Sequence, residues 1–160
     1  MATNTTLQKL DILDSEGNAF GVDTSNRRQV ETFISDGAIG LGDLVTFDVV
    51  DGGGAECTIK IIESPANKSA IGVALNAAAG AGEQVRVCLS GICEAQVEGK
   101  DQAGGAAISA GDYLCVGAVA GTLYLYGHHA NDKVPVAIAV DAVGSGDAAA
   151  QKTVVFLKQF

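Results

Sequence analysis

The sequence predicts an all-β protein, in which a small pseudo-duplicated β-barrel or sandwich follows an N-terminal extension. Short apolar runs alternate with turn residues along most of the chain, a spacing that is typical of sandwiches and barrels. The chain also has 21 glycines among 160 residues, which supply many tight turns. The third observation is an internal repeat, because the second half of the chain restates the pattern of the first.

The N-terminal extension is expected to span residues 1–36 and to lie outside the repeat. Its start, MATNTT, is polar and is expected to form a loose arm. The stretch KLDILDSEGNAFGV that follows has the pattern of a hairpin, with its turn at residues 14–18. Helical spacing of apolar residues occurs in residues 27–34, and a second short helix is expected at residues 144–152.

The rest of the chain is predicted to form short strands separated by Gly, Asp or Asn. The first runs are TFDVV, which meets the turn signal DGGG, and CTIKII, in which Thr58 and Lys60 alternate with apolar neighbours. The later runs are IGVAL, QVRVCL, ICEAQV, YLCVGAV, TLYLY, VPVAIAV and TVVFL. Their length and their flanking turn residues favour strands over helices.

The repeat pairs four strings of the first half with four of the second. IGLGD matches ISAGD, IGVALNA matches VAIAVDA, GAGE matches GSGD, and VRVCL matches TVVFL. We therefore expect residues 37–160 to form a duplicated β domain, with copies at about 37–99 and 104–160. Gly82 and Gly146 should occupy equivalent turns with positive φ. Two related half-barrels would close on each other about a pseudo-two-fold axis.

Charge and hydropathy exclude two classes of partner. Ten basic and nineteen acidic residues give a net charge of −9, so phosphate would repel the chain and no direct binding of nucleic acid is expected. No run of about twenty apolar residues occurs, so no membrane partner is predicted. The N-terminus lacks the apolar run of a signal peptide, so we expect synthesis in a cytoplasm.

No constellation of catalytic or metal-binding residues stands out in the sequence. The four cysteines, at positions 57, 88, 93 and 115, lie in apolar strand-like runs, so reduced and buried thiols are expected. Their spacing does not fit a CxxC metal site. The adjacent His128 and His129 would point to opposite faces of a strand and are expected in a solvated loop. We therefore predict no catalytic residue, no cofactor and no metal.

Two other functions stay open. The string NDKVPVAI places Lys133 after an acid and before an apolar strand, which is similar to lipoyl carrier domains, and a barrel-sandwich carrier or binding module with a modified Lys133 is the main alternative. A cysteine hydrolase that uses the histidine pair is the third hypothesis, although the chain has neither a GxSxG elbow nor a P-loop. An intact mass would test the carrier, and turnover lost on Cys→Ala substitution would test the hydrolase.

Several of these strings together resemble a known family. GLGDLV and AIGVALNAAAGAGEQVRVCLSGI in the first half, with AGDYL and VPVAIAVDAV in the second, are similar to the bacteriophage capsid decoration, or cement, proteins with a β-tulip-like fold. The resemblance covers about residues 35–160 and consists mostly of turn glycines and apolar strand residues. The second copy departs from the pattern, because Ala137 stands where the first copy has Gly72.

The resemblance implies a structural role without catalytic residues. Proteins of this family form homotrimers on the outside of an icosahedral shell, where they bind the major capsid protein and stabilise the contacts between capsomers. The resemblance therefore implies a virion protein of the outer capsid surface, made in the host cytoplasm. The acidic charge and the lack of a catalytic constellation agree with that role.

Seven residues are candidates for contact with the capsid or with other subunits. The adjacent basic pair could bind capsid carboxylates, and the apolar residues of the N-terminal segment could extend a neighbouring sheet. The run TLYLY is expected to present two leucines on one face and two tyrosines on the other. The alternative is that the N-terminal segment covers the protein's own barrel. The candidates are Leu7, Leu10, Ile12, Arg27, Arg28, Leu123 and Leu125.

Overall fold

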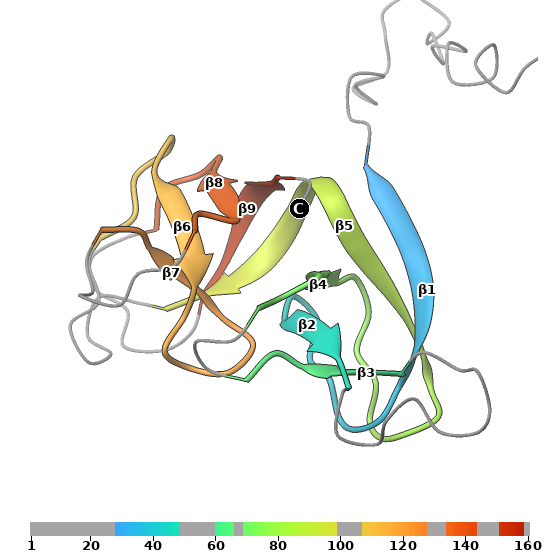
Figure 1. The fold of residues 1–160 in the computed structure, drawn as a ribbon. Helices are drawn as coiled ribbons and strands as arrows, with labels where there is room; N and C mark the ends of the chain where they lie inside the picture. The colour runs from blue at the N-terminus through green and yellow to red at the C-terminus, as the bar shows by residue number, and fades with distance from the viewer. Residues whose placement is uncertain are drawn as a thin grey trace, which may run out of the picture.

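A computed structural model confirms that the protein is all-β. It describes residues 28–48, 60–65, 69–98, 107–127, 134–143 and 151–158, and within these ranges the chain forms nine strands and no helix (Figure 1). The strands are β1 (Gln29–Ser35), β2 (Leu44–Phe47), β3 (Lys60–Glu63), β4 (Gly72–Ala74), β5 (Gln84–Val97), β6 (Tyr113–Val116), β7 (Leu123–Leu125), β8 (Ala137–Ala139) and β9 (Gln151–Leu157).

The strands close into two small barrels that share β5. The first barrel runs β1-β3-β2-β4-β5, and the pairing of β1 with β5 closes it. The second runs β5-β7-β6-β8-β9, and the pairing of β5 with β9 closes it. Figure 1 shows β5 bending as it passes from one barrel to the other. Its pairing changes from β1 to β9 between Ser90 and Gly91, and Gly91 has a φ of 99°. Closure leaves each barrel with few free strand edges.

The pairing registers confirm the internal repeat and move its boundaries. β2, β3 and β4 of the first barrel pair with one another as β6, β7 and β8 do in the second. The counterpart of β1 is the second half of β5. Ser35 of β1 pairs in parallel with Ile61 of β3, as Val97 of β5 pairs in parallel with Leu123 of β7. The repeat therefore begins at β1, and the copies meet inside β5, after residue 90. β1 thus belongs to the first barrel, whereas the sequence pattern placed it in the N-terminal extension of residues 1–36.

The helix expected at residues 27–34 is also wrong, because this stretch forms β1. The ladder with β5 supplies backbone hydrogen bonds along the strand, and Val30, Thr32 and Ile34 are β-branched residues that suit a pleated surface. Phe33 packs edge-on against Phe47, with ring centroids 5.9 Å apart. Of the second expected helix, residues 144–150 lie outside the described residues, and the rest begins β9.

The glycine-acid turns repeat in both barrels. Gly42 and Gly111 have φ values of 91° and 92°, a conformation that glycine adopts without strain. In both turns the following aspartate accepts a hydrogen bond from the backbone N–H three residues before it, at 2.6 Å for Asp43 and 2.7 Å for Asp112. The positive φ expected at Gly82 is confirmed at 88°, and its counterpart at position 146 lies outside the described residues.

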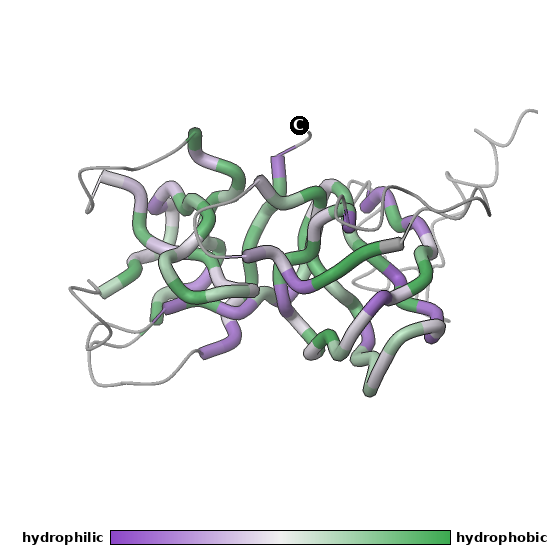
Figure 2. The backbone as a smooth tube through the Cα atoms, turned by 60° about the horizontal axis from the view of Figure 1, so that its bottom comes forward, coloured by the Kyte–Doolittle hydropathy of each residue, from purple (hydrophilic) through white to green (hydrophobic). Residues whose placement is uncertain are grey.

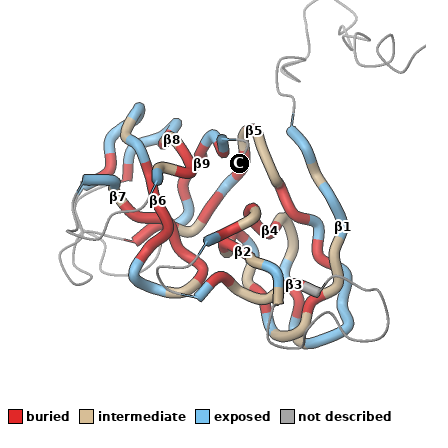
Figure 3. The backbone as a smooth tube through the Cα atoms, in the orientation of Figure 1, coloured by how far each residue is buried: buried red, intermediate tan, exposed pale blue. Residues whose placement is uncertain are grey.

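Two clusters of buried side chains form the core. Figures 2 and 3 show where the hydrophobic and the buried stretches of the backbone lie. The smaller cluster fills the first barrel. The larger cluster fills the second barrel and also takes in side chains from the outside of the first. The smaller cluster consists of Ile39, Val45, Ile61, Ala74, Ala78, Val85 and Val87. Because the larger cluster crosses from one barrel to the other, the two barrels pack as one unit.

Candidate interaction surfaces

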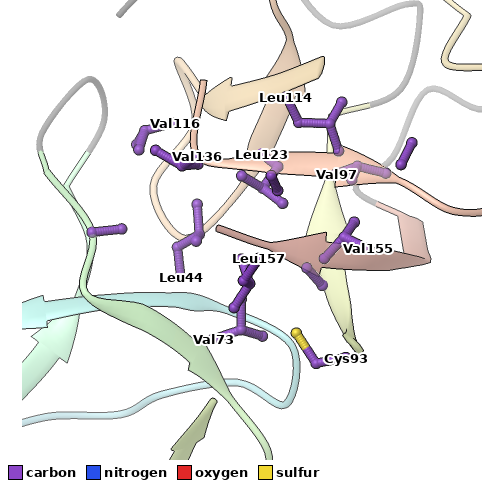
Figure 4. Close-up of a cluster of buried hydrophobic side chains, with 14 of the residues drawn as sticks. Leu44, Val73, Cys93, Val97, Leu114, Val116, Leu123, Val136, Val155 and Leu157 are labelled. Atoms are coloured by element: carbon purple, nitrogen blue, oxygen red, sulfur yellow. The ribbon is translucent and has the colours of Figure 1, made fainter. Parts of the chain in front are cut away.

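The outside of the first barrel carries an apolar row that the second barrel covers. Leu44 on β2 pairs with Val73 on β4, and Val73 pairs with Cys88 on β5, so the three side chains lie side by side. Each is at most 1 % exposed, and all three belong to the larger core cluster. Figure 4 shows Leu44 and Val73 beside Leu157 and Cys93 of the second barrel. The outer face of the first barrel is therefore an internal interface.

Backbone hydrogen bonds fix the orientation of the two barrels. The N–H of Leu44 donates to the carbonyl of Gly121 at 2.8 Å, and the N–H of Gly121 donates to the carbonyl of Ser64 at 2.9 Å. On another side of the joint, the N–H of Gln96 donates to the carbonyl of Gly42 at 2.8 Å. These bonds join the turn between β6 and β7 to the first barrel, and the first barrel's β2 turn to β5.

Two carboxylates lie beside this joint. Glu98 is 3 % exposed, and its Oε1 accepts hydrogen bonds from the Val119 N–H at 2.6 Å and from the Thr122 hydroxyl at 2.9 Å. It thereby holds the turn that contacts the first barrel. Partial burial raises the pKa of Glu63, and the negative charge of Asp43 raises it further.

Cys88, Cys93 and Cys115 are buried thiols, as predicted. Cys93 and Cys88 share a side-chain hydrogen bond across the bend of β5, and this bond, together with burial, raises the pKa of the Cys93 thiol. Cys115 is buried on β6. Cys57 lies outside the described residues. A thiol whose pKa is raised is a poor nucleophile, so Cys93 is suited to packing and not to covalent catalysis.

The part of the chain that the structure describes contains no cluster of metal-ligating residues. No group of three His, Cys, Asp or Glu residues there could hold a metal ion. Among these residues none forms a helix that could span a bilayer. His128, His129 and Lys133, on which the hydrolase and carrier hypotheses depend, lie outside the described ranges. Those two hypotheses stay predictions.

The predicted contact residues lie in different surroundings. Arg28 is exposed, directly before β1, and its positive charge offsets only a small part of the rise in the pKa of Cys93 on β5. Leu123 is 0 % exposed and belongs to the core of the second barrel, so it has no surface left for a neighbouring subunit. Leu125 is half-buried against the same core. The other four candidates, Leu7, Leu10, Ile12 and Arg27, lie outside the described residues.

The expected two-faced arrangement of the TLYLY run needs a correction. Tyr124 is only 2 % exposed, although its neighbour Leu123 points to the opposite face and is also buried. Only Tyr126, after the end of β7, is exposed, at 45 %. β7 is thus covered on both faces, as the burial of Leu123 and Tyr124 shows. Both of its edges are also paired, with β6 on one side and β5 on the other.

Sequence reasoning missed an apolar row on the outside of the second barrel. Tyr113 on β6 pairs with Ile138 on β8, and Ile138 pairs with Phe156 on β9. Tyr113 and Phe156 are 50 % and 44 % exposed. Ile92 on β5 pairs with Phe156 and extends the row to a fourth strand. The signal was present in the run TVVFL, where every residue is apolar or β-branched, so that both faces of the strand are apolar.

The fold thus defines a class of all-β protein: two five-stranded barrels joined through one long strand. No protein-family model and no curated protein matches the chain. Among solved structures, it is similar to the head fiber gp8.5 N base of bacteriophage phi29, with a TM-score of 0.53 and 17 % sequence identity. The match covers 82 % of this chain and 95 % of that one. At this identity the likeness is one of fold.

Proposed function

We propose that this protein is a structural component of a phage virion, a decoration or cement protein that binds the outside of the capsid. The observation that carries the proposal is the double barrel shared with the phi29 head fiber base over 82 % of this chain. The likeness supports a role in a virion, and the resemblance of the turn and strand strings to capsid decoration proteins supports the more specific role.

In the proposed role the protein is non-enzymatic and stabilises the contacts between major capsid protein capsomers. It acts as a homotrimer on the outer capsid surface. The acidic chain, with a net charge of −9, agrees with a position away from packaged nucleic acid. Two closed barrels also suit a structural protein that is present in many copies, because closed ladders leave few free edges for unwanted strand pairing between copies.

The N-terminal segment is the proposed binding surface for the capsid. Arg28 is exposed at the start of β1, where the chain enters the first barrel, and it forms an adjacent basic pair with the preceding arginine. Arginine binds carboxylates in a bidentate manner, so this pair suits an acidic surface of the major capsid protein. The apolar residues Leu7, Leu10 and Ile12 of the same segment would add to the contact.

The test is cosedimentation with empty capsids of the phage whose genome carries this gene, and the melting temperature of those capsids. We expect saturable binding and a higher capsid melting temperature with the protein present. Replacing Arg27 and Arg28 with Ala should lower capsid occupancy while the protein's own melting temperature stays unchanged. Arg86→Ala, at an exposed arginine of β5, is the matched control and should bind like the parent.

The outcomes test the decoration role, the binding surface and the carrier alternative separately. No binding of the parent protein to its capsids would overturn the decoration role. Undiminished binding by the arginine double variant would be consistent with the decoration role but would assign capsid binding to the barrels. An added lipoyl or biotin mass on the intact protein would instead favour the carrier with a modified Lys133.

A further inference from the structure

The internal repeat gives both barrels the same outer face, and only one of the two faces is covered within the chain. The covered row is Leu44, Val73 and Cys88, and the equivalent row in the second barrel is Tyr113, Ile138 and Phe156. The equivalence rests on the pairing registers, which match strand for strand. The second barrel covers the first row, whereas among the described residues the second row stays half-buried or exposed.

The uncovered row has the composition of an interface. At equivalent positions Tyr113 replaces a leucine and Phe156 replaces a cysteine, so the exposed row has larger side chains than the covered one. Tyr113 and Phe156 are 50 % and 44 % exposed, and Val140, which directly follows β8, is 42 % exposed. Aromatic residues are enriched at protein interfaces, and a contiguous apolar patch on a soluble protein marks an interaction site.

We propose that this outer row, Tyr113, Ile138, Phe156 and Ile92, is the docking surface for the first barrel of a second copy of the same chain. Within one chain, the covered row packs against the end of the second barrel formed by Leu157. By the same registers, the equivalent end of the first barrel contains Leu89, which is half-buried and apolar. The second copy therefore repeats, between chains, the packing that already exists between the barrels.

Charge complementarity supports the same pairing. Lys158 follows β9 at the edge of the row, and its Nζ lies 5.0 Å from the centroid of the Tyr113 ring. Glu31 on β1 is exposed and occupies, at the end of the first barrel, the position that Cys93 has at the end of the second. In the internal interface, Cys93 lies against the covered row through its hydrogen bond to Cys88. Glu31 of one copy would thus lie beside the basic edge of the row in the next.

The contact joins two different surfaces and is therefore head-to-tail. Such contacts close into a ring when the rotation allows and otherwise extend as a filament. The proposal names the surface of self-association and does not depend on capsid binding, so its test uses the isolated full-length protein. Failure here would leave the proposed capsid role standing.

The first experiment measures self-association of the full-length protein by sedimentation velocity over a micromolar concentration series. We expect the parent to associate, and Phe156→Glu to weaken association by at least about tenfold, because a carboxylate would be buried in the contact. Leu41→Glu, at an apolar turn residue that is 42 % exposed and outside the row, is the matched control and should associate like the parent. Thermal melts of both variants check folding.

The second experiment tests the direction of the contact. Glu31→Lys should also weaken association, and the double variant with Lys158→Glu should restore it, because the charges are exchanged. A mixture of Phe156→Glu and Glu31→Lys chains should form a one-to-one heterodimer, since the row of one and the barrel end of the other are intact.

Any of four results would overturn the proposal. A monomeric parent, or a Phe156→Glu variant that associates like the parent, would remove the row as a self-association surface. Loss of association in Phe156→Glu with no effect of Glu31→Lys would mean that two rows face each other. Reduced capsid binding by Phe156→Glu with unchanged self-association would assign the row to the major capsid protein.

Discussion

Adding a single methyl group at Gly72 should loosen the first barrel. Gly72 is buried on β4, directly against β5. A Cβ at this position would collide with the carbonyl oxygen of Cys88 and would lie 2.6 Å from Cγ1 of Val87. The carbonyl belongs to the backbone of β5, so no rotation of a side chain can relieve the collision. The second barrel accommodates a methyl group at the equivalent position, where Ala137 is fully buried. The clash is therefore specific to the first barrel.

The size of the effect follows from what must move. β4 and β5 would have to separate to bring the new methyl group to ordinary contact distance, and overpacking of this kind costs roughly 1–3 kcal/mol. We expect a value near the upper end, about 3 kcal/mol, because the obstacle is backbone and because β4 is one of five strands that close the barrel. For a chain of this size that corresponds to a fall in melting temperature of about 6–12 °C.

The assay is thermal and urea unfolding of Gly72→Ala beside the parent. Gly37→Ala is the control, because a Cβ there meets nothing within 4 Å and its φ lies outside the left-handed region. The control should melt at or slightly above the temperature of the parent, since alanine restricts the unfolded chain. A Gly72→Ala variant that melts within about 2 °C of the parent would refute the close approach of β4 and β5.

Three further predictions concern the joint between the barrels. Leu44→Ala should lower the free energy of unfolding by about 2–4 kcal/mol, because this side chain is 1 % exposed between the barrels; an unchanged urea midpoint would contradict that packing. Glu63→Gln should raise the melting temperature at pH 7, because the raised pKa of Glu63 means that the charged form destabilises the fold; the gain should vanish below the ordinary value of 4.5, and an equal gain at both pH values would contradict the assignment. Cys88 and Cys93 should react slowly with a thiol reagent in the native protein and quickly after denaturation, and fast native reaction would place them at the surface.

Much of the fold could be predicted from local patterns. Turn chemistry marks the chain at Gly42 and Gly111, where only a residue that tolerates positive φ fits and where an aspartate caps the turn. The matching strings in the two halves of the chain predicted the repeat. Of the candidate sites, sequence reasoning placed Arg28 at an exposed position but assigned Leu123 to a contact surface. A buried leucine and an exposed one look alike in a strand of three residues.

The sequence by itself determined the all-β class, the turns and the duplication, because period-two alternation and glycine spacing are local properties of the chain. Tertiary structure alone decided that β1 joins the first barrel, that β5 serves both barrels, and which apolar outer face is covered. These outcomes depend on pairings between strands far apart in the chain, such as Val30 with Cys88 and Cys93 with Val155. Alternation tells which residues share a face, but a strand that is apolar on both faces, as at Phe156, does not tell what will cover the second one.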